Sequence, residues 1–435
     1  MDTKKLRQKI LDLAIRGKLV PQDPNDEPAS VLLERIRAEK ERLIKEGKIK
    51  RSKKSASDTP HYENIDFDVP SSWEIITLSE VFFMHAGKSI SAADISPEPN
   101  EEYRYLCVGG NGKRGYVSSY NTVGAHPIIG RQGALCGNVN YTDGQVYATE
   151  HAVVVDTFCE TEAWWAYYFL KQLNLNQYAT ATAQPGLSVN TIGDVQIPLP
   201  PYKEQVRIVA AIEQWYSLID ALETAKEDLQ ISIEYTKSKI LDLAIHGRLV
   251  LQDPNDEPAI ELLKRINPKF VPCDNAHYEN VAEGWTVCTL EEIIDYEQPQ
   301  AYIVQSTDYK SQYKIPVLTA GKSFIIGYTN ESEGIFTDLP VIIFDDFTTD
   351  SKFVDFPFKV KSSAMKILHV KEEVNIQYIC WFMSVTRLIG DTHKRYWISE
   401  YSKLHIPIPP RKEQDRIINK VNELFQILDN ISGEL

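Results

Sequence analysis

Two Gly-Lys-Ser triplets are the first candidates for chemistry in this chain, because a phosphate-binding loop ends in such a triplet. They lie within Ala86–Ser89 and Ala320–Ser323. The loop also needs a glycine five residues before the Gly-Lys pair, so that its backbone amides can surround a phosphate. The residues at that distance are Phe82 and Pro316. Neither triplet is therefore expected to bind a nucleotide.

A Pro-Pro pair gives the second candidate, since amino-methylating enzymes use an Asn/Asp-Pro-Pro-aromatic loop. The chain reads Leu-Pro-Pro-Tyr at Leu199–Tyr202 and Ile-Pro-Pro-Arg at Ile408–Arg411. Both lack the acidic or amide residue, and the second also lacks the aromatic one. Each stretch precedes a long helical pattern, where proline is well suited to the first turn. We assign these prolines a structural role and expect no catalytic residue in this chain.

An acidic cluster leaves one enzymatic alternative open. Asp338, followed by Asp350 and Lys352, faintly resembles the carboxylates of a Mg²⁺-dependent nuclease. Such spacing is also common in acidic turns. The six cysteines include no Cys-x-x-Cys pair, so no zinc site is expected and a reducing compartment is indicated. We therefore expect neither a metal nor a cofactor bound by this chain.

An internal repeat explains how these segments are organised. Residues 9–36 align without a gap with 239–266, and residues 197–220 align with 406–429. A weaker pair, 61–81 with 277–293, lies between them in the same order. The segments between the repeated pieces do not resemble each other. The pattern indicates a duplicated frame that carries two different inserts.

The repeated frame is predicted to be helical. No proline or glycine occurs from Lys203 to His246, and Gly247 is a suitable residue to end the helix. A helix of this length would extend about 65 Å and is expected to act as a spacer. Apolar residues recur along it in heptads and predict a helix-pair seam. The seam residues are Ile212, Trp215, Ile219, Leu222, Leu229, Ile233, Ile240 and Leu243.

The second copy of this helix is split between the two ends of the chain. The alignment places its first half at the C-terminus and its second half at the N-terminus. We expect both to pack antiparallel against the central helix and to give a circular, pseudo-two-fold organisation. The alternative is that they are core helices of separate domains. The corresponding seam residues are Leu6, Ile10, Leu13, Val421, Leu424, Leu428 and Ile431.

The inserts have mixed strand and helix patterns, so the predicted fold class is α+β, with two α/β-type domains separated by a long helical pair. Strand-like runs include HPIIG and PVIIFDDF, and aromatic-rich helical runs occupy 162–173 and 375–389. The predicted divisions are a helical segment with a basic linker (1–60), a first domain (61–200), a central region with the long helix (201–276), a second domain (277–408) and a C-terminal helix (409–435).

These motifs resemble a known family, the DNA-specificity subunits of type I restriction–modification systems. The resemblance rests on the two KILDLAIxGxLVxQDPNDEPA segments, the two KEQxRI helices and the Trp-x₄-Leu start of each insert. Within the inserts it rests on IIGRQGALCGNVNY, YATEHAVVV, IPVLTAGKSFIIGYT and VIIFDDFTTDSKFV. It implies that each insert is a target-recognition domain that reads one half of a split double-stranded DNA sequence.

The resemblance also implies partners. In such systems the helices set the gap between the half-sites and dock two methyltransferase subunits. Those subunits bind S-adenosylmethionine and methylate adenine, and restriction or translocase subunits can join them. A duplicated frame is what docking two identical partners onto one chain would require. The alternative from a different class is a coiled-coil scaffold that binds proteins and has no role on DNA.

Charge is the main evidence against a DNA role. The net charge is −14, and both inserts are acidic: residues 62–200 hold 6 Lys and Arg against 15 Asp and Glu, and residues 278–405 hold 12 against 18. Because phosphate contacts supply most sequence-independent affinity, the chain alone is expected to bind DNA weakly. The side chains able to contact bases or phosphates are Lys88, Lys113, Arg114, Arg131, Gln132, Asn138, Lys322, Lys352, Lys394 and Arg395.

No membrane partner is expected. The first twenty residues alternate charged with apolar side chains, which is unlike a secretory signal, and no run approaches 18 apolar residues. The expected location is the cytoplasm.

Overall fold

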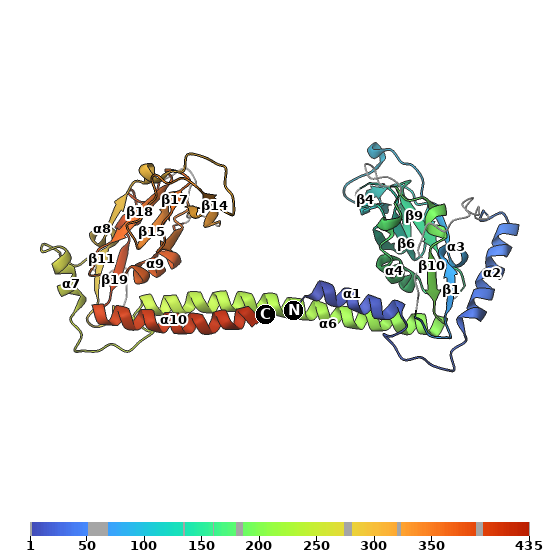
Figure 1. Cartoon of the computed structure of the whole chain (residues 1–435), viewed down its shortest axis with the longest axis horizontal. Coiled ribbons are helices and arrows are strands. Elements are labelled where there is room, and N and C mark those ends of the chain that lie inside the picture. Colours follow the sequence, from blue (N-terminus) through green and yellow to red (C-terminus); the bar gives the residue numbers. More distant parts are fainter. Residues whose placement is uncertain are drawn as a thin grey trace. The chain divides into compact units, whose positions relative to one another are not determined.

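The computed structural model describes residues 2–50, 68–133, 135–159, 161–179, 186–273, 281–319, 323–388 and 395–434 (Figure 1). It combines helices with short strands, which confirms the mixed α and β content expected from the sequence. The chain divides into two compact units, Met1–Ala225 and Lys226–Leu435. The division falls inside the long helix α6 (Tyr202–Ile245), because the two parts of this helix pack on different segments.

In the first unit, helices come before and after a series of short strands in the sequence. Its elements are α1 (Thr3–Ile15), α2 (Ala29–Lys45), β1 (Glu74–Thr77), α3 (Leu78–Val81), β2 (Phe83–Ala86), β3 (Tyr105–Gly109), β4 (Gly112–Val117), β5 (Thr122–Val123), β6 (His126–Gly130), β7 (Val139–Thr142), β8 (Gln145–Ala148), β9 (Ala152–Asp156), α4 (Ala163–Gln172), α5 (Val189–Gly193), β10 (Gln196–Leu199) and the part of α6 up to Ala225.

The second unit has the same kinds of element in the same order. They are the rest of α6, α7 (Ala259–Ile266), β11 (Thr286–Thr289), α8 (Leu290–Ile293), β12 (Ile294–Glu297), β13 (Ile315–Leu318), β14 (Ile325–Thr329), β15 (Val341–Asp345), β16 (Ser351–Val354), β17 (Lys359–Val360), β18 (Met365–Val370), α9 (Ile376–Val385), β19 (His405–Ile408) and α10 (Arg411–Glu434).

The two inserts share a strand order although their sequences differ. One sheet of the first unit has the order β2-β9-β6-β7, and one sheet of the second has the order β12-β18-β15-β16. The orders β4-β3-β8 and β14-β13-β17 correspond in the same way, with β5 added beside β8. In each unit an antiparallel pair, β1–β10 or β11–β19, joins the start of the insert to its end. The inserts are therefore variants of one fold.

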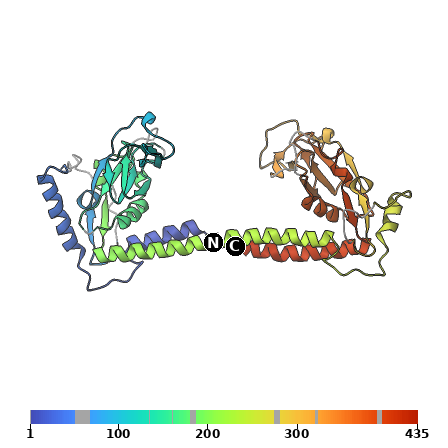
Figure 2. The ribbon, with the colours of Figure 1, turned by 180° about the vertical axis from the view of Figure 1, so that it is seen from behind.

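Within the first unit, α1 packs antiparallel to the start of α6 (Figure 2). Arg7 of α1 forms ion pairs with Asp220 at 2.5 Å and Glu223 at 3.0 Å, and Ile10 is buried in the same core as Ile212. Gln22, which follows α1, donates a hydrogen bond to Glu204 near the beginning of α6. These contacts show that the two segments run in opposite directions.

The second unit repeats this arrangement with α10 and the end of α6. Lys237 pairs with Asp429 at 2.7 Å, and Ser432 donates to Gln230 at 2.8 Å. Since α10 aligns with the start of α6, and α1 aligns with its end, each unit holds one complete copy of the repeated helices.

The predicted seam residues do not share one environment. Ile10, Ile212, Ile219, Ile233, Ile240 and Val421 are buried, and Leu6, Leu13, Leu243, Leu424 and Leu428 are partly buried. By contrast, Trp215, Leu222, Leu229 and Ile431 are between 38% and 48% exposed. When only two helices pack together, each buries about one row of apolar side chains. The residues at the second heptad position therefore lie at the edge of the contact and stay partly exposed.

The predicted glycine ends the long helix, and a second glycine follows α1. Gly247 ends α6 with φ +66°, and its counterpart Gly17 follows α1 with φ +63°. A Cβ at Gly247 would lie 2.7 Å from the Cβ of Ala282, so a side chain does not fit there. At the start of α2, Pro28 occupies the cap position and the helix begins at Ala29.

Candidate nucleic-acid interface

The KEQ triplet that opens α6 anchors the first insert to the helical frame. Glu204 is buried, accepts a hydrogen bond from Trp73 Nε1 at 2.9 Å and accepts another from Gln22 at 2.5 Å. Burial raises the pKa of the Glu204 carboxyl above its ordinary value. Two distant segments, the turn after α1 and the start of β1, are thus held by one side chain.

The next polar residues of this helix complete the anchor. Gln205 donates to the Pro200 carbonyl at 3.0 Å and accepts from the Glu162 backbone N–H at 3.0 Å, which fixes the start of α4. Arg207 forms an ion pair with Asp26 at 2.7 Å, and the Asp26 side chain is almost fully buried. The repeated motif therefore ties the α1–α2 turn, α4 and α6 together.

The second unit repeats these contacts with its own residues. Glu413 accepts from Gln252 at 3.0 Å and lies beside Trp285. Gln414 donates to the Pro409 carbonyl and accepts from the Asn375 backbone N–H, and Arg416 pairs with Asp256 at 2.7 Å. Burial also raises the pKa of Glu413. The repeat is therefore a joint between frame and insert, built twice.

Several loops of the first insert converge beside the end of β6. The Lys88 backbone pairs with Thr149, and Arg131 N donates to the carbonyl of His151 at 2.9 Å. A Cβ on Gly130 would lie 2.6 Å from the oxygen of Gly110, so these two loops approach as closely as backbone allows. This recognition edge, defined as Lys88, Gly109–Gly112, Gly130–Gln132 and Thr149–His151, brings residues together that are far apart in sequence.

The predicted DNA-contacting residues of the first insert are distributed around this edge. Arg114 packs over Gly109, and Asn138 accepts from Gly130 N through its backbone and keeps an exposed side chain. Lys113 instead lies over the Tyr116 ring and donates to its hydroxyl. Arg131 forms no ion pair with any described residue. The sequence did not single out Glu150 and His151, although YATEHAVVV contains both.

A cleft of about 890 Å³ runs along the edge strand β2 of the first unit. Its cationic lining consists of Lys48 and Lys50, from the basic segment after α2, together with Lys88. The rest of that basic segment, from residue 51, lies outside the described residues.

On the same sheet, His85 and His126 both face one carboxylate. Asp156 Oδ2 lies 3.3 Å from His85 Nε2, and Oδ1 lies 3.1 Å from His126 Nδ1. Burial of the carboxyl would raise its pKa, but the hydrogen bonds from the two histidines lower the pKa of Asp156 to about 2. The hydrogen bond to Asp156 raises the pKa of His85; for His126, burial opposes the rise but does not outweigh the Asp156 interaction.

Of the four DNA-contacting residues predicted in the second insert, the structure describes two. Lys352 is on β16 and half-buried, and Arg395 is exposed with its guanidinium over the Phe347 ring. Lys322 and Lys394 lie outside the described residues. Two other lysines are buried in ion pairs: Lys359 with Glu331 at 3.0 Å and Lys366 with Asp346 at 3.2 Å.

The nuclease alternative is not supported by the geometry of β15. Asp338 precedes this strand and Asp350 follows it, so a strand of about 16 Å separates the two carboxylates. Asp350 is also paired with Arg387 at 2.7 Å. Within the described parts of the chain, no group of three His, Cys, Asp or Glu side chains could hold a metal ion.

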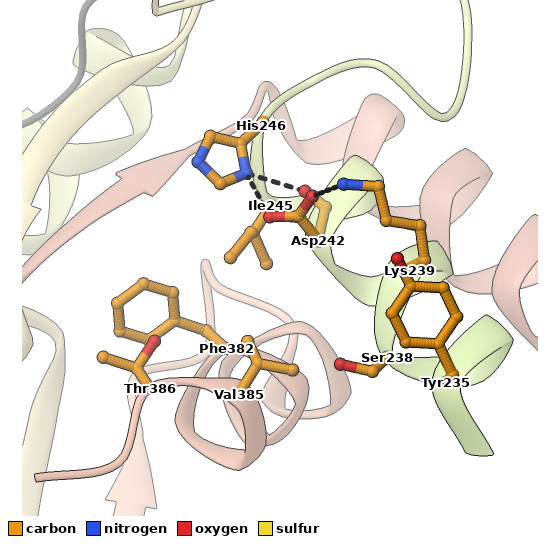
Figure 3. Close-up of a pocket in the computed structure, with 9 residues that line it drawn as sticks. All are labelled: Tyr235, Ser238, Lys239, Asp242, Ile245, His246, Phe382, Val385 and Thr386. Atoms are coloured by element: carbon orange, nitrogen blue, oxygen red, sulfur yellow. Dashed lines mark hydrogen bonds and ion pairs between the residues drawn. The ribbon is translucent and has the colours of Figure 1, made fainter. Parts of the chain in front are cut away.

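A cavity of about 510 Å³, lined by both polar and apolar residues, lies between α6 and α9 in the second unit (Figure 3). Lys239 and His246 both contact Asp242 on its α6 side, while Phe382 and Val385 lie on its α9 side. In the first unit the corresponding helices, α1 and α4, leave a cavity of only about 10 Å³, lined by Leu11, Ala14, Trp165 and Phe169 among others.

Among the described residues, no helix is both long and apolar enough to cross a membrane.

Comparison with known proteins shows similarity both to a part of the chain and to nearly its whole length. Residues 70–231 match the family described as type I restriction modification DNA specificity domain. The chain is 26% identical to the type I restriction enzyme EcoAI specificity subunit of Escherichia coli, over 98% of this chain and 90% of that protein.

The chain is thus similar to the specificity subunits of type I restriction enzymes.

A shorter and stronger similarity concerns a second specificity subunit. The chain is 46% identical to the EcoR124I/EcoR124II specificity subunit of E. coli over 36% of this chain, and the match spans only 41% of that relative's length. A solved structure described as the basis of complex assembly and conformational transition of the type I R-M system is 14% identical. It covers 84% of this chain and 93% of its own, with a TM-score of 0.52, and shows similarity of fold.

Proposed function

We propose that this chain is the non-catalytic, sequence-specific DNA-recognition subunit of a type I restriction–modification complex. The observation that carries the proposal is that two copies of one joint hold two inserts of the same strand order but unlike sequence. A protein that recognises a bipartite double-stranded DNA sequence needs this combination. Its two partner subunits must bind to equivalent surfaces, while its two domains must recognise different half-sites.

In this proposal the recognition domains are residues 61–200 and 277–408. The antiparallel contacts of α6 with α1 and with α10 support a helical spacer that closes the chain into a circular, pseudo-two-fold arrangement. The spacer length then sets the gap between the two half-sites. The lysines of the β2 cleft and the recognition edge supply contacts to phosphates and bases.

Two methyltransferase subunits would dock on the helices, one at each copy of the frame. Trp215, Leu218 and Leu222 form an exposed apolar stripe on α6 in the first unit. The repeat places Leu424, Ile427 and Ile431 at the same positions of α10, and the last two are exposed. Equivalent apolar stripes at equivalent places support two identical partners, which bring S-adenosylmethionine; restriction or translocase subunits can join them, and the location would be the cytoplasm.

The proposal is tested by mapping methylated adenines in cells that express the chain with its methyltransferase. We expect a split motif, and we expect one half alone to change when one insert is exchanged for that of a relative. No sequence-specific methylation would favour a protein-binding scaffold. Mg²⁺-dependent cleavage by the purified chain, lost in Asp350→Ala, would favour a nuclease.

A further inference from the structure

Gln132 presents an exposed side chain from a backbone that is fixed on both sides. On one side, Arg131 N donates to the His151 carbonyl at 2.9 Å. On the other, the Arg131 carbonyl accepts from Leu187 N at 2.8 Å, and Gln132 itself forms a bridge with Gly186. Because the backbone is held while the amide is free to meet a ligand, the side chain is ordered at little further entropic cost.

His151 determines which way this amide points. Its Nδ1 lies 2.8 Å from Gln132 Oε1, so the ring donates and the amide oxygen accepts. Its Nε2 lies 3.3 Å from Glu150 Oε1. With the oxygen held on the histidine side, the two amide N–H groups and one remaining lone pair of Oε1 are available to a ligand.

Glu150 and Thr149 lie at the base of this arrangement. Glu150 Oε2 and Thr149 Oγ1 are both buried and accept or donate no hydrogen bond within the described part of the chain. Thr149 is completely buried. The Glu150 side chain as a whole is 37% exposed, and its other oxygen lies beside the His151 ring, where it can hold that ring in place.

The second insert offers a different chemistry at the equivalent position. There the turn after β15 begins with Asp345, whose carboxylate accepts from the backbone N–H groups of Phe347 at 2.9 Å and Thr348 at 3.0 Å. The described residues of this turn present no glutamine or asparagine. Two equivalent loops with different exposed groups are what two different half-sites require.

We propose that Gln132 reads an adenine in the half-site recognised by the first insert, with His151 and Glu150 as positioning residues that orient its amide. An amide of this orientation donates to adenine N7 through Nε2 and accepts from N6 through the free lone pair of Oε1. Arg131, which has no ionic partner among the described residues, lies beside it to contact a neighbouring base or phosphate. This inference rests on the proposed function.

The test is adenine-methylation mapping in cells that express the full chain with its methyltransferase, for wild type and four variants. Gln132→Ala is expected to tolerate other bases at one position of the first half-site, with discrimination there reduced about 10- to 100-fold. His151→Phe keeps the ring but loses the donor, so it should relax the same position. His151→Gln restores a donor and should recover part of the discrimination. Gln145→Ala removes an exposed glutamine at the far end of β8 and should leave the motif unchanged.

The outcomes separate this inference from the proposed function. An unchanged motif in Gln132→Ala overturns the inference while wild type still yields a split motif. Relaxation by His151→Phe at a different position, or a uniform loss of methylation at all positions with an unchanged thermal midpoint, overturns the positioning role. A wild type that gives no split motif overturns the proposed function itself. In every valid result the second half-site serves as an internal reference.

Discussion

The buried carboxylate of Glu204 is the residue on which the joint of the first unit depends. It binds Trp73 and Gln22, which come from segments on either side of the basic linker, and no cation among the described residues pairs with it at hydrogen-bonding distance. Its raised pKa follows from burial, so the ionised form is disfavoured in the folded chain. The same holds for Glu413.

Substitution of Glu204 tests this account. Glu204→Ala leaves the Trp73 N–H and the Gln22 amide without an acceptor and should lower the free energy of unfolding by about 2–4 kcal/mol. Glu204→Gln keeps one of the two acceptors and should cost less than Glu204→Ala. Because the folded pKa is raised, the stability that Glu204 contributes is present below its unfolded pKa and lost as pH rises through the folded pKa.

Denaturant titration of both variants measures these differences. Relative to wild type, Glu204→Gln should gain stability as pH rises above the ordinary carboxyl pKa. An equal loss in both variants, independent of pH, would contradict the role given to the carboxyl group.

The His85–Asp156–His126 cluster predicts a second pH dependence. The histidine pKa values are raised in the fold, so their contribution is complete below the unfolded value and is lost as pH rises through the folded values. The Asp156 contribution is present above its unfolded pKa and is lost as pH falls towards about 2. These side chains are partly exposed, so the total should be below about 1 kcal/mol.

Histidine chemical shifts followed by NMR would check this cluster. Asp156→Asn should shift the titration of His85 and His126 to lower pH, and it should flatten the loss of stability above neutral pH. The His246 ring, which lies in the second unit, is the reference. Unchanged titration of His85 in Asp156→Asn would show that the pair is not formed.

At the scale of elements, α6 combines two kinds of surface. Its isoleucines Ile212, Ile219, Ile233 and Ile240 are buried, and all but Ile233 belong to a core that includes residues of α1 or α10. The next heptad position remains exposed at Trp215, Leu222 and Leu229. A helix that needed only to fold would not keep a tryptophan 48% exposed on such a stripe, and contiguous exposed apolar side chains mark interaction surfaces.

Single aspartates on this stripe should remove one methyltransferase at a time. Leu218→Asp in α6 and Ile427→Asp in α10 occupy equivalent repeat positions, and both wild-type residues are at least half exposed. Each variant should therefore keep its thermal midpoint but bind one subunit in place of two, and the double variant should bind none. Mass measurement of the reconstituted complex reports the stoichiometry. Ile231→Asp, at an exposed position without a repeat counterpart, is the control, and loss of both subunits in one single variant would contradict separate docking.

At the scale of the whole molecule, charge decides how tightly the chain can hold DNA alone. A net charge of −14 opposes phosphate contacts, and the β2 cleft of the first unit contributes only three lysines, Lys48, Lys50 and Lys88. Few phosphates can then be neutralised, which gives low affinity and a shallow salt dependence.

Fluorescence anisotropy should show weak binding of a random duplex by the isolated chain at physiological salt. Addition of methyltransferase subunits should raise the affinity at least 100-fold and steepen the slope of log affinity against log salt, because the subunits add phosphate contacts. Tight binding by the chain alone, with a steep slope, would contradict this division of roles.

The sequence by itself determined the duplicated frame, the α6 helix to within one residue at each end, and the mixed composition of the inserts. These features depend on local information: the spacing of the repeats, the absence of helix-breaking residues and the periodicity of apolar side chains. The KEQ triplets were visible as a motif, but their contacts with Trp73, Gln22 and Asp26 were not, because the partners lie far away in the chain.

Only the tertiary structure decided which residues share a surface. His151 is 19 residues from Gln132, and a backbone bridge joins Lys88 to Thr149, so no pattern in the sequence connects them. The common strand order of the two inserts was also hidden, since side chains that face a core can change while volume and apolar character are retained. The exposure of Trp215, Leu222 and Leu229 depends on how many helices are present, because two helices bury one stripe and leave the next exposed.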